Sequence, residues 1–216
     1  MMIAKDGFKF IIYTGVVFLV LMFCAIQFDF FLFTILVYCL GFLFVFNFFF
    51  LRDPERQTPE GDSIIISPAD GKVIKIAEVE EPVYFKGKAM LISVFMSVLN
   101  VHVNRIPISG EVDYIDYKKG HYLAAFNDKA TDINEQSMIG IRGEKGKVYF
   151  KQIAGVLARR IIYHLKLNEI VRSGERFGLI RYGSRLDVYV PVDAKIKVQL
   201  KQKVRSGVTI LAEFSS

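Results

Sequence analysis

The sequence predicts a mainly β soluble domain, sandwich-like or barrel-like, preceded by a two-helix transmembrane hairpin. The first quarter of the 216 residues is nearly continuous in Phe, Leu, Val and Ile. After it, short β-type runs recur between turn-forming residues, and helical periodicity is scarce. Residues 195–201 alternate polar and apolar side chains, which is typical of a strand with one buried face. Together these features predict few helices beyond the N-terminal hairpin.

The apolar N-terminal segment, residues 1–51, is long enough for two membrane-spanning helices. A helix needs about 20 residues to cross the hydrocarbon core of a bilayer. Gln27 and Asp29 interrupt the apolar run and predict a connecting turn, so the spans are expected at residues 10–26 and 30–51. A cleavable signal peptide is the rival interpretation, but the apolar run is too long for one and no small-residue cleavage site follows it.

Basic residues flank both ends of this hairpin. Lys5 and Lys9 precede the first span, and Arg52 and Arg56 follow the second. Because positive residues near membrane spans favour the cytoplasmic side, both ends of the hairpin are expected there. The soluble domain is therefore predicted to lie at the cytoplasmic face of the cell membrane.

Residues 52–62 predict a linker, since they combine two prolines and a glycine with polar side chains, and residues 63–216 form the β-rich domain. Residues 155–168 have apolar spacing that suits a helix, but their β-branched content suits a strand equally well. The clearest strands are expected at residues 64–67, 71–76, 90–95, 110–117, 137–142 and 147–154.

Charge and cysteine content narrow the classes of partner. The formal net charge is +6, and most of the basic excess follows the apolar segment. A basic domain beside a membrane indicates anionic lipid headgroups, although ordinary solubility charge explains the same excess. The basic residues are scattered, so no nucleic-acid partner is expected. Both cysteines, Cys24 and Cys39, lie in the apolar segment, so neither a disulfide framework nor a metal cluster is predicted.

A Gly-Ser pair, Gly183 and Ser184, separates two β-type runs near the C-terminus. Alone, such a pair indicates a bulge or a turn. Its surroundings are more specific, because FGLIRYGSRLDVYVP at 177–191 resembles the processing segment of the short-form phosphatidylserine decarboxylases. SPADGKV at 67–73 resembles the Asp-Gly turn of that family, and NVHVNRIP at 100–107 resembles its histidine segment. Order, spacing and the paired N-terminal spans also agree, so the resemblance covers essentially the whole chain.

The resemblance implies a proenzyme that cuts itself into a large chain, 1–183, and a small chain, 184–216, which stay together as a heterodimer. The hydroxyl of Ser184 would attack the carbonyl of Gly183, and β-elimination would leave residue 184 as a pyruvoyl cofactor, with no metal and no pyridoxal phosphate. The pyruvoyl group would form a Schiff base with phosphatidylserine in the membrane and release CO2 to give phosphatidylethanolamine. Gly183 suits this chemistry because it permits a distorted backbone. A higher oligomer stays open.

His102, Asp70 and Arg105 are the other site residues that the resemblance implies. His102 would serve as acid and base, and Asp70 would orient it. Arg105 stands where longer-form relatives carry a second histidine, and it is a candidate for binding the carboxylate or phosphate of the substrate. Without the resemblance, His102 is typical of a packed strand residue and Asp70 of a turn.

Three further charged or titratable residues are left without a role in this scheme. His121 and His164 match no assigned position and are interpreted as structural or headgroup-facing. Asp187 is expected to pair with Arg185, to support the site, or to be an exposed strand charge.

Two other classes of function are compatible with the bare sequence. A membrane-tethered, non-enzymatic β-domain, such as a lipoyl-like or adaptor module, predicts an intact chain. A membrane serine hydrolase with Ser184 as nucleophile predicts labelling by serine-directed reagents without chain splitting, but the nucleophile-elbow pattern is missing around that serine. A decarboxylase acting on another amino-acid-bearing lipid is also compatible with the sequence.

Overall fold

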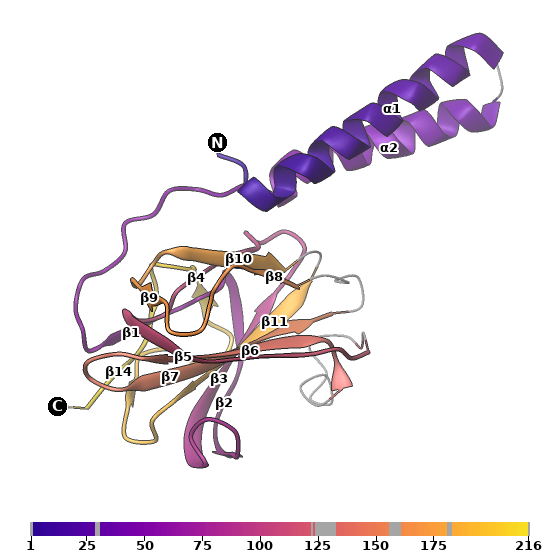
Figure 1. The fold of residues 1–216 in the computed structure, drawn as a ribbon. Coiled ribbons are helices and arrows are strands. Elements are labelled where there is room, and N and C mark those ends of the chain that lie inside the picture. Colours follow the sequence, from indigo (N-terminus) through magenta and orange to yellow (C-terminus); the bar gives the residue numbers. More distant parts are fainter. Residues whose placement is uncertain are drawn as a thin grey trace. The chain divides into compact units, whose positions relative to one another are not determined.

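The computed structural model describes residues 2–28, 31–121, 123, 133–155, 161–180 and 183–215. The chain divides into two compact units, Met1–Glu55 and Arg56–Ser216. Each unit has its own architecture (Figure 1). Arg56, which the sequence analysis assigned to the linker, belongs to the second unit.

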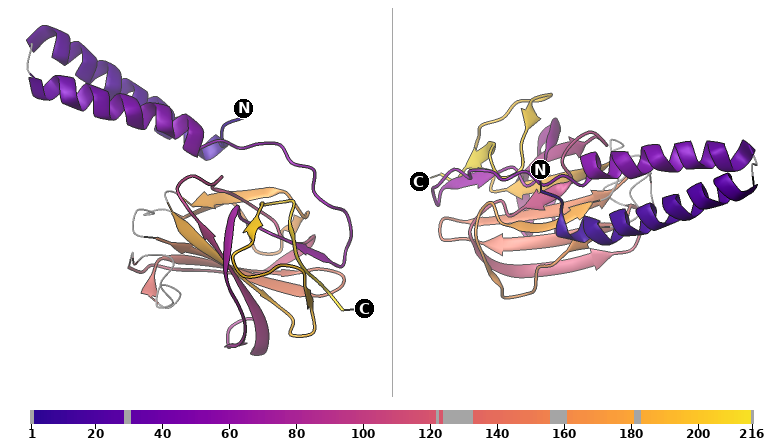
Figure 2. Two further views of the ribbon diagram at one scale, coloured as in Figure 1. Left: turned by 180° about the vertical axis from the view of Figure 1, so that it is seen from behind. Right: turned by 90° about the horizontal axis from the view of Figure 1, so that it is seen from above.

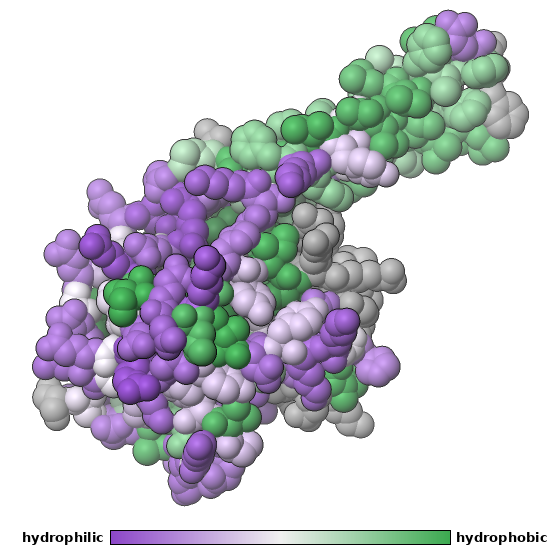
Figure 3. Space-filling model, viewed as in Figure 1, coloured by the Kyte–Doolittle hydropathy of each residue, from purple (hydrophilic) through white to green (hydrophobic). Residues whose placement is uncertain are grey.

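The first unit is a pair of apolar helices. A short 3-10 turn, Lys5–Gly7, leads into α1 (Phe8–Phe28), and α2 (Phe31–Phe50) returns alongside it (Figures 1 and 2). Among the described residues these two helices are long and apolar enough to cross a membrane. Their large side chains are mostly exposed and form the continuous hydrophobic surface of Figure 3. The two predicted apolar helices are therefore present, while Asp29 of the predicted turn lies outside the described residues.

Glycines let the two helices approach closely. A Cβ added at Gly15 would lie 3.0 Å from the ring of Phe44, and one added at Gly41 would lie 3.1 Å from the ring of Phe18. Each glycine thus makes room for an aromatic ring of the other helix, and the rings of Phe18 and Phe44 stack with their centroids 6.1 Å apart. Small residues at such positions are typical of helix pairs within membranes.

The second unit is built from antiparallel strands, which confirms the mainly β prediction. Turn-forming residues separate the strands, and β-branched residues fill them. The strands are β1 (Ile64–Ile66), β2 (Gly71–Glu81), β3 (Gly87–Met96), β4 (Val103–Arg105), β5 (Gly110–Lys118), β6 (Gln136–Arg142), β7 (Lys147–Ala154), β8 (Ile161–Tyr163), β9 (Ile170–Val171), β10 (Arg176–Ile180), β11 (Ser184–Val190), β12 (Lys195–Ile196), β13 (Lys203–Val204) and β14 (Ile210–Glu213).

Three sheets share one core in the described part of the chain. Eight strands form a curled sheet in the order β13-β2-β3-β11-β7-β6-β5-β9, and two three-stranded sheets have the orders β4-β10-β8 and β1-β14-β12 (Figures 1 and 2). A core cluster contains Leu186 and Val188 of β11, Phe177 of β10 and Leu211 of β14. The three sheets are therefore held together by buried apolar side chains.

Strand β11 occupies a central place in the large sheet and is buried along its whole length. Leu186 and Val188 point into the main core, while Tyr189 on the opposite face belongs to a second apolar cluster with Tyr149. Burial raises the pKa of Tyr149 far above its usual range, so this phenol stays neutral. Because both faces of β11 are covered, the backbone of its first residue, Ser184, is held in a fixed position.

Two segments differ in detail from the sequence prediction. Residues 195–201 were expected to form one strand, but β12 ends at Ile196. The chain then turns, with the N–H of Gln202 bonded to the carbonyl of Gln199 at 3.2 Å and Lys201 at φ +69°. Within residues 155–168, which suited helix or strand, the described part contains strand β8, and residues 156–160 lie outside the described residues.

Candidate active site

Ser184 is the first residue of β11 and is held by strands on both sides. It pairs with Met96 of β3 and with Ala154 of β7. The side chain is fully buried, and its hydroxyl donates to the sulfur of Met96 at 3.4 Å. A thioether is a weak acceptor, so this contact orients the hydroxyl without activating it. Activation of Ser184 needs a stronger base nearby.

Gly183 adopts a backbone conformation that favours glycine. Its φ is +73°, in the left-handed region, where a residue with a Cβ is destabilised by about 1–2 kcal/mol. Space alone would admit a side chain, since an added Cβ would have its nearest neighbour, Val98, at 3.9 Å. The backbone angle therefore explains why glycine suits this position.

His102 contacts the backbone directly before the serine. Its Nε2 accepts the N–H of Gly183 at 3.3 Å, and its Nδ1 lies 2.9 Å from the carbonyl oxygen of Asn100. A carbonyl can only accept and a backbone N–H can only donate, so these two contacts assign the proton to Nδ1 and a lone pair to Nε2. The buried His102 ring thus presents an unprotonated nitrogen at the backbone of Gly183, the residue that precedes Ser184 in the sequence.

Asp70 lies in the turn before β2 and is bound by two groups. The guanidinium of Arg56 contacts both of its carboxylate oxygens, with Nη2 donating to Oδ2 at 2.8 Å. The N–H of Ser206 donates to Oδ1 at 2.8 Å. The hydrogen bonds seen for the carboxylate go to Arg56 and Ser206, so the expected role of Asp70 in orienting His102 stays a prediction.

Arg105 and Arg185 are both buried arginines, and both have nearby partners. Nη1 of Arg105 donates to the carbonyl of Gly174 at 2.9 Å, and its stem passes over Gly207, where an added Cβ would lie 2.6 Å from Cδ. Its predicted role in substrate binding stays a prediction. Arg185 pairs with Asp187, with Nη2 donating to Oδ2 at 3.0 Å. Of the alternatives for Asp187, the pair with Arg185 is present, and its buried side chains exclude an exposed strand charge.

The two remaining histidines take no part in this arrangement. His121 and His164 are exposed. The backbone N–H of His164 donates to the carbonyl of Phe177, which is a structural contact.

A buried chain of amides beneath the serine was missed by the sequence analysis. Ser137 donates to Oε1 of Gln152 at 2.6 Å, and Nε2 of Gln152 donates to Oδ1 of Asn104 at 2.8 Å. Nδ2 of Asn104 then reaches the sulfur of Met96 at 3.8 Å, the same sulfur that accepts from Ser184. One sequence signal could have revealed it: polar residues at core-facing positions of otherwise apolar strands. Buried amides are normally hydrogen-bonded, so such residues indicate a buried hydrogen-bond network.

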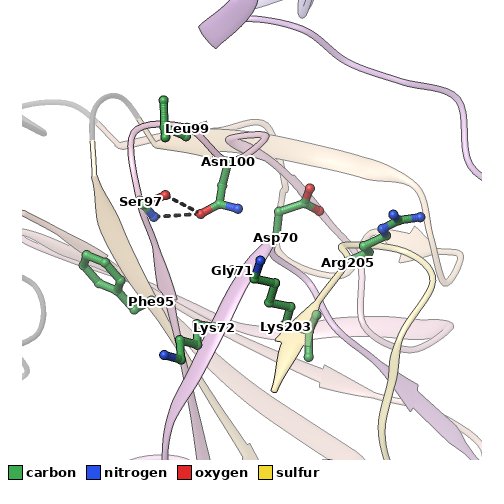
Figure 4. A pocket seen from close by; sticks show the side chains of 10 residues that line it. Asp70, Gly71, Lys72, Phe95, Ser97, Leu99, Asn100, Lys203 and Arg205 are labelled. Atoms are coloured by element: carbon green, nitrogen blue, oxygen red, sulfur yellow. Dashed lines mark hydrogen bonds between the residues drawn. The ribbon is translucent and has the colours of Figure 1, made fainter. Parts of the chain in front are cut away.

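A pocket of about 470 Å³ lies beside this site, between the start of β2, the end of β3 and strand β13 (Figure 4). Asp70 and Asn100 form part of its wall. Asn100 connects the pocket to the histidine, because it lines the pocket and its backbone carbonyl holds Nδ1 of His102.

Comparison with known proteins assigns the chain to a family. The family model described as phosphatidylserine decarboxylase matches residues 43–212. A phosphatidylserine decarboxylase proenzyme of Wolbachia pipientis wMel is 46% identical over 172 residues, covering 77% of this chain and 75% of that protein. Proteins of the same name from Salinibacter ruber and Desulfotalea psychrophila are 46% and 45% identical, over 78% of this chain and 76% and 79% of their own lengths. This chain belongs to the phosphatidylserine decarboxylase family.

Proposed function

We propose that this protein decarboxylates phosphatidylserine with a pyruvoyl group that it makes by cutting itself between Gly183 and Ser184. The observation that carries the proposal is the arrangement at that bond. A glycine in the left-handed conformation precedes a serine locked at the head of a central strand, and Nε2 of His102 lies on the glycine N–H. Serine, base and adaptable backbone are the parts that self-cleavage needs.

In the first stage, His102 takes the proton of the Ser184 hydroxyl, and Oγ attacks the carbonyl carbon of Gly183. The C–N bond between the two residues breaks, the nitrogen of residue 184 leaves as an amine, and an ester joins Gly183 to Oγ. Removal of the α-proton of residue 184 then expels Gly183 as a carboxylate. Water replaces the nitrogen of the resulting enamine, ammonia departs, and residue 184 is left as a pyruvoyl group.

The fold supports these steps by fixing residue 184. The backbone pairing with β3 and β7 holds the position before and after the bond is cut, so the new terminus stays where it formed. The complete burial of Ser184 keeps bulk water away from the ester, whose hydrolysis would otherwise compete with elimination. Residue 184 therefore suits a pyruvoyl group.

A pyruvoyl group supplies an electrophilic carbonyl and an electron sink for loss of CO2 from an amino acid. The side chains around it supply proton transfer and position. His102 contacts the N–H of Gly183 at 3.3 Å, and imidazole is the side chain suited to accept and return a proton, so we assign to it the protonation of the carbon that has lost CO2. Asp70 is kept as a supporting carboxylate that, through its bonds to Arg56 and to the N–H of Ser206, fixes the segments around this region.

The two predicted chains would remain associated as a heterodimer. Residues 184–216 contribute β11, which lies between two strands of the larger chain, so separating the chains would open the core. The apolar helices suit membrane association, where phosphatidylserine resides, and we place the β unit on the cytoplasmic side on the basis of the flanking basic residues.

Intact-mass spectrometry of the purified full chain tests the proposal, together with CO2 release from phosphatidylserine in mixed micelles. We expect two chains divided between Gly183 and Ser184, a small chain blocked by pyruvoyl, and turnover. Ser184→Ala should stay uncut and inactive, and His102→Ala should impair splitting, turnover or both.

The other outcomes separate the alternatives. An uncut, inactive wild-type chain would favour the tethered β-domain. Labelling of Ser184 by a serine-directed reagent without splitting would favour the hydrolase. Splitting without turnover of phosphatidylserine would point to another amino-acid-bearing lipid.

A further inference from the structure

The pocket beside the catalytic candidates is lined, among the described residues, by three basic residues and one acidic residue. Its volume of about 470 Å³ is within the range of 300–1,000 Å³ that is common for sites of small ligands. Its wall is made by a basic group of residues from β2, β13 and the turn after β13, and by the end of β3 with the segment that follows it. The lining residues are Asp70, Gly71, Lys72, Phe95, Ser97, Leu99, Asn100, Lys203, Val204 and Arg205 (Figure 4).

Cations at this pocket lack carboxylate partners. Lys72, Lys203 and Arg205 are exposed, and in the part of the chain that the structure describes no carboxylate forms an ion pair with them. Asp70, the acidic residue in the described lining, has its charge matched by Arg56. The pocket therefore has a net positive charge that the protein does not neutralise.

Two of these cations are held next to each other by the sheet. Lys72 of β2 is the direct partner of Lys203 of β13. Residues directly opposite in an antiparallel pair project from the same face, and like charges in that arrangement are destabilising. An anion bound between the two ammonium groups would remove the repulsion. The arrangement is therefore explained by a ligand more readily than by solubility.

Asn100 adds a neutral donor. The backbone N–H of Ser97 donates to Oδ1 of Asn100 at 2.9 Å, and the Ser97 hydroxyl donates to the same oxygen at 2.8 Å. Because that N–H can only donate, the oxygen of the Asn100 amide is assigned to the Ser97 side and the NH2 group to the other side. In Figure 4 this NH2 group is turned toward Asp70 and the pocket.

We propose that this pocket binds the phosphodiester of the lipid headgroup, with Lys72, Lys203 and Arg205 on the phosphate oxygens. The inference rests on the proposed function and adds to it the site that holds the anionic part of the substrate. Ammonium and guanidinium groups form strong, charge-assisted hydrogen bonds with phosphate. Asn100 lines this pocket and its carbonyl also holds Nδ1 of His102, so the amino-acid end of the same headgroup is directed toward the reacting bond.

Leu99 indicates a lipid as the source of the phosphate. Its side chain lines the pocket and is 62% exposed. An apolar group in this position suits the glycerol and acyl part of a lipid, while a free phosphate ion would gain nothing from it. Arg105, the earlier candidate for this task, is buried and donates to Gly174, whereas the pocket cations are accessible.

Kinetics of the double variant Lys72→Gln/Lys203→Gln test the proposal, with phosphatidylserine in mixed micelles as substrate. We expect KM to rise about tenfold or more, kcat to stay within about twofold, and the chain to split normally, since the loss is of ground-state and transition-state binding alike. Arg205→Gln should act in the same direction. Lys145→Gln is the matched control, because Lys145 is exposed in the turn between β6 and β7, at the far end of β7 from Ala154.

A second measurement separates failure of the pocket from failure of the proposed function. Glycerophosphoserine, the soluble headgroup, is titrated by calorimetry into uncut Ser184→Ala protein with and without the two lysine substitutions. Binding that the substitutions abolish supports the pocket even if the wild-type chain neither splits nor turns over. Unchanged KM and unchanged titration in the double variant would overturn the proposal. Competition by inorganic phosphate with an unchanged KM would overturn it too, because the pocket would then be a site for free phosphate.

Discussion

Two Arg–Asp pairs in the β unit, one buried and one partly buried, have similar chemistry and different settings. Arg185 and Asp187 are two residues apart on β11, with 3% and 0% of their side chains exposed. Arg56 and Asp70 are 14 residues apart, with 9% and 12% exposed, and the pair joins the start of the β unit to the turn before β2. The first pair is a property of one strand, whereas the second exists only because the fold brings two segments together.

The neighbours of the two carboxylates differ as well. Asp187 lies between Ser93 and Lys151 in the middle of the sheet. Asp70 borders the cationic pocket and binds the N–H of Ser206, which belongs to the predicted small chain. Buried ion pairs contribute little net stability compared with apolar residues of the same size. Stability alone therefore does not explain them, and the neighbours of each pair indicate its role. We infer that the pair at Asp187 is structural and the pair at Asp70 serves the site.

Replacement of each carboxylate by an amide should separate the two pairs most strongly. Asp70→Asn keeps the shape and removes the charge, and we expect splitting or turnover to fall about 100-fold or more, because we propose that this carboxylate supports proton transfer at His102. Asp187→Asn should change either rate by less than about tenfold. Mass spectrometry over a time course and CO2 release measure the two rates. Equal losses in the two variants would remove the distinction between the pairs.

Stability should show the opposite ranking. Asp187→Ala leaves the guanidinium of Arg185 buried without its carboxylate, which destabilises a protein by about 3 kcal/mol and lowers Tm by roughly 6–12 °C. Arg185→Met/Asp187→Leu should recover most of the loss, because Phe95 and Ile153 flank position 185 in the sheet. Melting of the full chain in detergent, followed by circular dichroism, is the measurement. A double variant as unstable as the single one would contradict this explanation, because the instability would then not come from the unpaired charge of Arg185.

The same contrast explains what the sequence predicted and what it missed. Repeating β-type runs and the apolar N-terminal segment are local signals, and they predicted the strands and the two helices. The pairing of Arg185 with Asp187 was also local, and it was one of the alternatives considered from the sequence. The pairing of Arg56 with Asp70 was not, because no local pattern connects a polar linker residue with a turn 14 positions further along the chain.

Burial was the harder property to predict around the site. Gln152 shares a strand face with Val148 and Phe150, and Ser137 shares one with Ile139 and Ile141, so both polar side chains point toward the apolar core. Both faces of the neighbouring β11 are covered, so these polar side chains are enclosed and bond to each other. The early end of β12 was also not predictable from the pattern, since the alternation continues to Lys201, whose φ is +69°.

Ser206→Ala should give the smallest effect and shows how the pair at Asp70 connects the two predicted chains. The hydroxyl donates to the carbonyl of Pro68 at 3.0 Å, but the N–H of Arg105 donates to the same carbonyl, and the backbone N–H that binds Asp70 is untouched. Loss of one such hydrogen bond destabilises by about 1 kcal/mol, or roughly 2–4 °C in Tm. Splitting and turnover should be unchanged, as measured by the two assays used for Asp70→Asn. A rate loss approaching that of Asp70→Asn would show that the hydroxyl of Ser206 takes part in the reaction. A small shift in Tm alone would show that the two predicted chains are connected here by the backbone N–H of residue 206 and the carboxylate of Asp70, not by the hydroxyl.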